Sequence, residues 1–311
     1  MASKTKKSTK PDELENPLGL GHLSELVNVK EEDDDRVVQF AESEGVALIA
    51  FIASYVPVRV SPIEEVRAAI SLPDEFGIEA LVELLREAGT QDAYLLVNSL
   101  GGAMSSSYKI ARAIRSTLDN IVTFVPHIAA SGGTLLALTG NEIVMGPMSH
   151  LSPLDVQMRY KGTSVSAATF MRFFGRASGW FERMAPEEAP YPLRSLADKL
   201  DPFIMEEWNG VMEAAVSYVS EILELAGYGD GEEAAQNLVL RFPTHSYVIT
   251  RDKAREIGFN VKDSEDFKDI WGTMRYWLSK YVFTEEPTHC IRYVLPTSSM
   301  KKNDAVKEEN E

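Results

Sequence analysis

Ser131 stands in a run of small residues that could present a nucleophile. The stretch HIAASGGTLLAL, from His127 to Leu138, follows an apolar run that ends at a proline. Small neighbours let a serine side chain stand exposed at a helix N-terminus, where free N–H groups and the helix dipole favour a developing oxyanion. A serine that merely caps the helix gives the same pattern. This turn alone therefore leaves the role of Ser131 open between nucleophile and cap.

A second glycine turn ends an earlier apolar run. It lies in VNSLGGAMSSS, from Val97 to Ser107, where paired glycines let the backbone approach a ligand and can aim N–H groups outward. An oxyanion hole needs N–H donors that converge from separate segments. Neighbouring strands of a parallel sheet, each ending in a glycine turn at the same edge, can supply two such donors. The two turns together therefore favour a nucleophilic site.

The residues around these turns alternate between apolar runs and amphipathic periods. The predicted strands are the apolar runs at residues 45–58, 93–99, 120–126 and 141–147. The predicted helices, with apolar residues at helical spacing, cover residues 73–89, 105–118 and 132–140. Strands that alternate with amphipathic helices predict an α/β fold with a parallel sheet covered on both faces. Functional residues gather where the strands of such a sheet end.

Two longer helices are predicted in the second half of the chain. Residues 203–227 and 264–282 each carry one apolar stripe, and the second stripe is rich in aromatic residues. Such stripes are typical of core packing, and a subunit contact is the second interpretation. We predict one domain over residues 36–296, with a flexible acidic tail at residues 1–35 and a second flexible tail at residues 297–311.

The composition limits the partners of the protein. The 311 residues include 47 acidic and 31 basic ones, which give a net charge of −16, and basic residues cluster only at the extreme N-terminus. A nucleic-acid partner is therefore not expected, because proteins of that class present a basic face. Cys290 is the only cysteine, so an intramolecular disulfide is excluded, and neither a metal nor a cofactor is expected.

No segment has the pattern of a signal peptide or a transmembrane helix. The N-terminal residues are polar, and the longest apolar run, at residues 45–58, has 14 residues and ends at prolines. A membrane-spanning helix needs about 20 apolar residues. We therefore expect a soluble protein in the cytoplasm.

Four stretches resemble, in order, motifs of the serine dehydrogenase proteinase family, which lies in the Clp protease and crotonase superfamily and is related to signal peptide peptidase A. They are LLVNSLGG, HIAASGGTLLAL, EIVMGPMSHLSPLDVQ and THSYVITRDKAREIGFNV, and the resemblance covers roughly residues 45–262. The chain departs from the family at Leu100, where the family has proline, and at LSPLDVQ, where it has LGPIDPQ. Neither departure removes a candidate catalytic group.

The resemblance implies a Clp/crotonase-like α/β fold with a parallel sheet, flanking helices and helical elaborations toward the C-terminus. It implies Ser131 as the nucleophile and the backbone N–H groups of Gly102 and Gly132 as the oxyanion hole. The activity would be that of a serine peptidase that cleaves peptide or protein substrates through an acyl-enzyme. Because relatives form rings and tetramers, a homo-oligomer is expected.

The general base is the group that the motifs define least. A serine hydroxyl needs a neighbouring base to take its proton. One arrangement uses His245 as the base and Asp155 to orient it, since triads occur with their members in different chain orders. The remaining candidates are His150, Asp155 itself and Lys161. His245 and Asp155 can equally be structural, as a satisfied histidine and a turn cap.

The other histidines are expected outside the catalytic machinery. We expect His127 to pack beside the nucleophile turn, and His22 and His289 to lie on the surface. Two further functions fit the sequence: a crotonase-like acyl thioester hydrolase or isomerase, and a catalytically inactive oligomeric scaffold. Labelling by a serine-reactive fluorophosphonate probe distinguishes the peptidase from the scaffold, and binding to coenzyme A resin marks the thioester enzyme.

Overall fold

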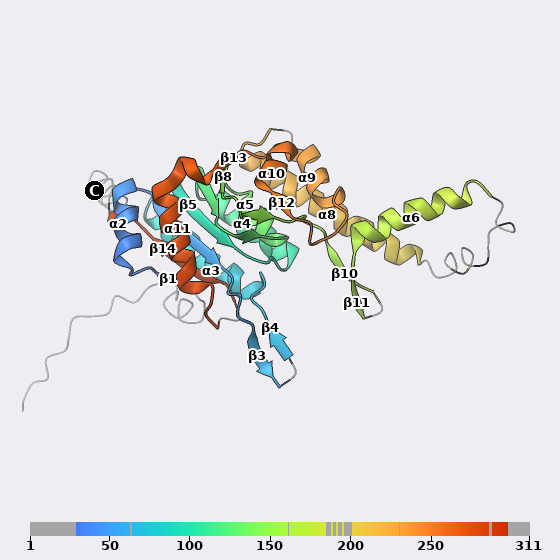
Figure 1. Ribbon diagram of the computed structural model, residues 1–311, viewed down its shortest axis with the longest axis horizontal. Coiled ribbons are helices and arrows are strands. Elements are labelled where there is room, and N and C mark those ends of the chain that lie inside the picture. Colours follow the sequence, from blue (N-terminus) through green and yellow to red (C-terminus); the bar gives the residue numbers. More distant parts are fainter. Residues whose placement is uncertain are drawn as a thin grey trace, which may run out of the picture.

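A seven-stranded sheet between two layers of helices forms the centre of the protein (Figure 1). The computed structural model describes residues 29–297 except 63, 161, 230, 286, 287 and most of 185–200. The sheet order is β1-β14-β2-β5-β6-β8-β13. Its strands are β1 (Val29–Glu31), β14 (Cys290–Val294), β2 (Ala47–Ile52), β5 (Asp92–Asn98), β6 (Asn120–Val125), β8 (Glu142–Met145) and β13 (Val261–Asp263).

The sheet is mostly parallel, as the sequence pattern predicts. Strands β2, β5, β6, β8 and β13 pair in parallel, so their carboxyl ends lie at one edge. Strand β14 runs antiparallel to β2 and carries the parallel strand β1 on its other side. The predicted α/β fold is confirmed, and the four predicted strands correspond to β2, β5, β6 and β8. The pair formed by β14 and β1 is an addition that the pattern does not predict.

Successive residues of the central strands point to opposite helical layers. Ile49 and Phe51 of β2 belong to one core cluster, and Leu48 and Ala50 belong to the other, as the two-residue period of a strand requires. The first cluster packs against α3 (Leu72–Glu87), α4 (Met104–Arg115), α5 (Gly132–Ala137), α8 (Pro202–Leu225), α9 (Gly231–Leu240) and α10 (Arg251–Ile257). The second cluster packs against α2 (Asp35–Glu44) and α11 (Lys268–Tyr281).

Several smaller elements surround the sheet. A three-stranded sheet in the order β12-β9-β7 comprises β12 (Ile249–Thr250), β9 (His150–Leu151) and β7 (Ile128–Ala129). Two hairpins pair β3 (Val58–Ser61) with β4 (Glu64–Val66) and β10 (Gln157–Tyr160) with β11 (Thr163–Ser166). The second hairpin leads into α6 (Ala167–Phe181), which extends away from the main sheet beside the start of α8 (Figure 1). Among the described helices, none combines the length and apolar character needed to cross a membrane.

The aromatic stripe of residues 264–282 lies inside the protein. These residues form the 3-10 helix η1 (Ser264–Phe267) and α11, whose Ile270, Met274 and Trp277 are buried in the second core cluster. The core interpretation is confirmed for these three side chains, which α2 and the sheet cover, while Trp271 and Tyr281 of the same stripe are half-buried. A homo-oligomer therefore remains a prediction that this stripe does not support.

The fold begins earlier than the predicted domain boundary. Residues 29–34, expected in a flexible tail, form β1 and the cap of α2. Glu32 is only 3% exposed and accepts hydrogen bonds from Trp277 Nε1 at 2.6 Å and Lys280 Nζ at 2.9 Å. Burial raises the pKa of Glu32, but the hydrogen bonds from Lys280, Tyr281 and Trp277 outweigh it and leave the pKa below its ordinary value. The acidic run is thus partly structural, and residues 1–28 and 298–311 of the two predicted tails lie outside the described residues.

Candidate active site

The two glycine turns pack against each other at the carboxyl edge of the sheet. Gly101 follows β5 with a φ of +89°, a conformation that favours glycine. A Cβ atom on Gly101 would lie 2.6 Å from the Ala130 carbonyl oxygen and 2.8 Å from the Ser131 Cβ atom. The first turn can therefore approach the second turn only because position 101 has no side chain.

Ser131 has a strained backbone conformation. Its φ of 51° and ψ of −121° belong to the first central position of a type II′ turn, which the hydrogen bond from Gly133 N–H to the Ala130 carbonyl closes at 2.8 Å. Among the residues that the structure describes, it is the only non-glycine residue with positive φ. Such strain costs about 1–3 kcal/mol and is concentrated at functional sites.

The side chain of Ser131 does not cap the helix that follows it. Ser131 precedes α5, yet its hydroxyl makes no capping hydrogen bond to that helix. The side chain is half-buried, so part of it faces solvent. The interpretation of Ser131 as a capping serine is therefore wrong, and the hydroxyl is held on a turn without a helix-capping task.

Contacts with the small sheet β12-β9-β7 hold the turn that carries Ser131. The Ser131 N–H donates to Ser152 Oγ at 2.8 Å, and Ser152 follows directly after β9. Thr134 Oγ1 is placed 2.8 Å from each of the carbonyl oxygens of Ala129 and Ser152. These contacts tie both sides of the turn to β7 and β9. No motif in the sequence marks Ser152 as a residue that supports this turn.

Two backbone N–H groups beside Ser131 are available to an oxyanion. Ile70 N–H donates to the Gly101 carbonyl and Ala103 N–H donates to the Ile70 carbonyl, both at 2.8 Å, so the N–H of Gly102 faces away from Ile70. Gly132 is the first residue of α5, where an N–H has no helical acceptor. Within the described part of the chain, neither N–H has a protein acceptor. Both groups can therefore donate to a ligand.

His245 and Asp155 are brought together, but through the backbone. His245 Nδ1 lies 3.1 Å from the main-chain carbonyl oxygen of Asp155. A carbonyl only accepts hydrogen bonds, so Nδ1 carries the proton and Nε2 is left as an acceptor. The buried Asp155 carboxylate accepts hydrogen bonds from Ser166 Oγ at 2.8 Å and Gln157 Nε2 at 3.2 Å. No hydrogen bond between described residues joins His245 to Ser131.

His150 lies in a different environment. Its N–H donates to the His127 carbonyl at 3.0 Å, and the two imidazole rings are 6.2 Å apart in an edge-to-face arrangement. Burial, followed by the charge of His127, lowers the pKa of His150 below its ordinary value. His127 also hydrogen-bonds Tyr55 and lines a cavity of about 450 Å³ beside α11. Lys161 lies outside the described residues.

One expectation about the remaining histidines is wrong. His289, predicted at the surface, is fully buried at 0% exposure. Its Nε2 is 2.8 Å from Ser99 Oγ, and its ring stacks on Phe51 with centroids 4.2 Å apart. No local pattern could reveal this contact, because 190 residues separate Ser99 from His289. His22 lies outside the described residues.

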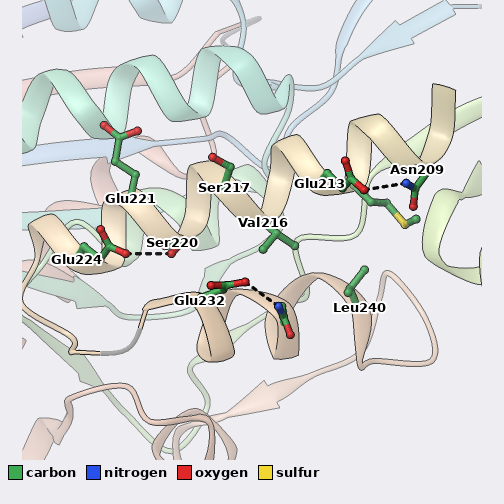
Figure 2. A pocket seen from close by; sticks show the side chains of 11 residues that line it. Asn209, Glu213, Val216, Ser217, Ser220, Glu221, Glu224, Glu232 and Leu240 are labelled. Atoms are coloured by element: carbon green, nitrogen blue, oxygen red, sulfur yellow. Dashed lines mark hydrogen bonds between the residues drawn. The ribbon is translucent and has the colours of Figure 1, made fainter. Parts of the chain in front are cut away.

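A larger cavity lies apart from these residues. It has a volume of about 660 Å³, runs between α8 and α9, and contains no residue of the glycine turns. Figure 2 shows the carboxylates on its walls, three of which are bonded to neighbouring side chains: Glu213 to Asn209, Glu224 to Ser220, and Glu232 to Gln236. This cavity does not contribute to the candidate site.

The segment that carries the two turns has known relatives. Residues 78–173 match the family of ClpP-like SDH-type serine proteinases. The resemblance drawn from the motifs is therefore confirmed over this segment. It contains Gly102, Ser131, Gly132 and Asp155 and ends before His245. The family match therefore covers both glycine turns and does not reach His245.

Two curated proteins of Methanocaldococcus jannaschii resemble the chain. Uncharacterized protein MJ0137 is 28% identical over 168 residues, and uncharacterized protein MJ1495 is 26% identical over 170 residues. The aligned residues are 54% of this chain in both cases, and 52% and 51% of the two relatives. The chain therefore spans about half the length of the curated relatives it matches.

Two solved structures are distant neighbours. The 1510-N membrane-bound stomatin-specific protease is 13% identical with a TM-score of 0.42, and the match covers 65% of this chain and 80% of that one. An enoyl-CoA hydratase/isomerase from Marinobacter aquaeolei is 10% identical with a TM-score of 0.37, over 77% of this chain and 74% of that one. At these scores the fold assignment rests on the sheet order and helical layers described above.

Proposed function

We propose that this protein is a serine peptidase that forms an acyl-enzyme on Ser131. The observation that carries the proposal is the strained, half-buried Ser131 on a turn where its hydroxyl makes no capping hydrogen bond. The match of residues 78–173 to a serine proteinase family supports the same chemistry. Strain of about 1–3 kcal/mol persists in proteins mainly where function requires it.

In the proposed reaction, Ser131 Oγ attacks the carbonyl carbon of the scissile peptide bond, and its proton passes to His245 Nε2. The N–H groups of Gly102 and Gly132 donate to the oxygen as it becomes negative. When the tetrahedral intermediate collapses, the C–N bond breaks and the amine leaves with the proton from His245. Water then attacks the acyl-enzyme with the same base and releases the acid.

The assignment of the base to His245 rests on its tautomer. In the neutral ring, the hydrogen bond from Nδ1 to the Asp155 carbonyl makes Nε2 the acceptor nitrogen, which is the tautomer that a general base requires. Asp155 then acts through its main chain, while Ser166 and Gln157 brace its carboxylate. The proposal requires His245 and Ser131 to come within hydrogen-bond reach in the substrate complex, since catalytic hydrogen bonds often tighten only there.

Peptide or protein substrates follow from this chemistry. A homo-oligomeric state and a cytoplasmic location remain predictions. The thioester enzyme and the inactive scaffold stay as alternatives that the experiment below separates from the peptidase.

Labelling with a fluorophosphonate probe tests the proposal. The wild-type protein should be labelled, mass spectrometry of its peptides should place the adduct on Ser131, and Ser131→Ala should abolish labelling and cleavage of a fluorogenic peptide mixture. Removal of a serine nucleophile lowers rates by several orders of magnitude. Absence of any adduct on folded wild-type protein would favour the scaffold, and retention on coenzyme A resin would favour the thioester enzyme.

A further inference from the structure

Three buried polar side chains lie beneath the two glycine turns. Ser99 and His289 have 0% exposure and Asp74 has 1%. Ser99 Oγ is 2.8 Å from His289 Nε2, and His289 Nδ1 is 3.3 Å from Asp74 Oδ1. These are the residue types of a serine-hydrolase triad in the same spatial order. Their burial excludes them from touching a substrate, so another task must explain them.

Ser99 is bonded to both glycine turns. Its Oγ accepts the N–H of Gly101 at 3.0 Å. Its carbonyl accepts the N–H of Ala130 at 2.9 Å, directly before the nucleophile. Its own N–H donates to the Ile128 carbonyl at 3.0 Å. A Cβ atom on Gly133 would lie 2.9 Å from the Ser99 carbonyl oxygen, so this residue also fixes how closely the second turn can approach.

We propose that Ser99, His289 and Asp74 form a buried positioning network that sets the conformation of the oxyanion turn. This proposal rests on the proposed function at Ser131. A serine hydroxyl rotates freely unless a partner fixes it. The contact with His289 Nε2 fixes the Ser99 hydroxyl, so that one of its lone pairs stays directed at the Gly101 N–H. The orientation of Gly101 in turn determines where the next N–H, that of Gly102, is aimed.

Asp74 closes this network on the other side of Gly102. Its Oδ1 accepts the main-chain N–H of His289 at 3.3 Å and lies 3.3 Å from the ring Nδ1, which makes no hydrogen bond within the described part of the chain. Its Oδ2 accepts the N–H of Ser71 at 2.9 Å. Ser71 directly follows Ile70, which forms the parallel bridge with Gly102. The oxyanion turn is therefore held from both sides by groups that meet at Asp74.

The packing around Gly102 leaves little freedom for an alternative turn. A Cβ atom there would lie 2.2 Å from Ile70 N and 2.3 Å from Ile70 O, so the backbones are in direct contact. Displacing a reacting group by about 1 Å can cost on the order of 100-fold in rate. A loss of the buried hydrogen bonds should therefore appear as a loss of catalytic rate with little effect on substrate affinity.

The test compares Ser99→Ala with the matched control Ser54→Ala. Ser54 is 1% exposed, and its Oγ accepts the N–H of Val56 at 3.0 Å, the same two-residue spacing as in the Ser99 turn. Ser99→Ala should lower kcat and the rate of fluorophosphonate labelling about 10- to 100-fold, with KM within about twofold. Ser54→Ala should leave both rates within about twofold of wild type at a similar loss of thermal stability.

Variants at His289 test the network through a second member. His289→Gln keeps an amide that can hydrogen-bond Ser99, whereas His289→Leu fills similar space without one. The first variant should retain a labelling rate at least about fivefold above the second. Equal rates in the two variants, or equal losses in Ser99→Ala and Ser54→Ala, would overturn the proposal.

Amide hydrogen exchange, which does not depend on catalysis, tests the positioning network independently of the proposed peptidase activity. Amide hydrogen exchange at Gly101 should be at least about 10-fold faster in Ser99→Ala than in wild type, because its N–H loses a buried acceptor. If wild-type protein is not labelled at Ser131, the proposed function fails while the exchange result still decides the network. Unchanged exchange at Gly101 would refute the network even in an active peptidase.

Discussion

Replacement of Ser131 by glycine should stabilise the protein while abolishing its activity. Ser131 occupies φ 51° and ψ −121°, where a side chain is unfavourable and glycine is not. Relief of this strain contributes about 1–3 kcal/mol. The larger entropy of glycine in the unfolded chain offsets about 0.5–1 kcal/mol. The net gain for Ser131→Gly should therefore be about 1 kcal/mol, whereas Ser131→Ala keeps the Cβ atom and the strain.

The same two substitutions at a serine with an unstrained backbone provide the control for the effect of backbone strain at Ser131. Ser116 caps the end of α4 with φ −74° and ψ −7°, a conformation that any residue adopts. There, glycine should be less stable than alanine by up to about 1 kcal/mol. At Ser131 the order should be reversed.

Thermal unfolding measures both pairs at one protein concentration, because subunit association would make Tm concentration-dependent. In a chain of this size, about 1 kcal/mol corresponds to roughly 2 °C in Tm. We expect Ser131→Gly about 2 °C above Ser131→Ala, with fluorophosphonate labelling absent in both. If glycine is the less stable variant at Ser131 as it is at Ser116, the turn is not strained and the reasoning that led to the nucleophile fails.

Three further predictions concern the same region. Gly102→Ala should destabilise the protein by about 1–3 kcal/mol in urea unfolding and abolish labelling, because its Cβ atom would meet the backbone of Ile70. His245→Ala should reduce the rate of peptide cleavage nearly as much as Ser131→Ala. Asp155→Asn should reduce this rate less, because the main-chain carbonyl of residue 155 stays in place. A fully active His245→Ala variant would show that another residue is the base. The pKa of His150 is lowered in the folded state, so the unfolded chain takes up the proton more readily. The contribution of His150 to the free energy of unfolding is therefore complete above its unfolded pKa of about 6.5 and is lost as the pH falls below that pKa. The free energy of unfolding of His150→Gln should therefore decrease less between pH 7 and pH 5 than that of wild type, and parallel pH profiles would contradict this.

The central strands and helices could be predicted from the sequence because each has a local period. The run at residues 45–58 contains β2, whose residues are all buried, as in a strand covered on both faces. Strand β14 has five residues, and its position beside β2 depends on pairing between residues about 240 positions apart in the chain. Strand β1 has three residues in an acidic context. Its place in the sheet is decided by tertiary contacts such as Glu32 with Lys280, which no local pattern contains.

The candidate site also has parts that a local pattern predicts and parts that depend on contacts between distant residues. The glycine turns are local, so the sequence located Gly102, Ser131 and Gly132 correctly as neighbours. The residue types predict that the Asp155 side chain orients His245. The observed contact instead uses the main-chain carbonyl of Asp155, which a pattern of side chains cannot specify. The burial of His289 could not be predicted from its neighbours in the sequence, because its hydrogen-bond partner Asp74 lies 215 positions away.

Two serines at the ends of neighbouring strands illustrate what decides a role. Each precedes a pair of glycines, and their residue types alone do not separate them. Ser99 has no exposure, and its hydroxyl is engaged by Gly101 and His289, so its oxygen is occupied in every conformation that keeps the turn. Ser131 is half-buried with part of its surface accessible, its hydroxyl makes no capping hydrogen bond, and its backbone is strained. Access and strain are therefore the grounds on which we propose Ser131 and not Ser99 as the nucleophile, and the satisfied hydrogen bonds of Ser99 suit it to the supporting role proposed above.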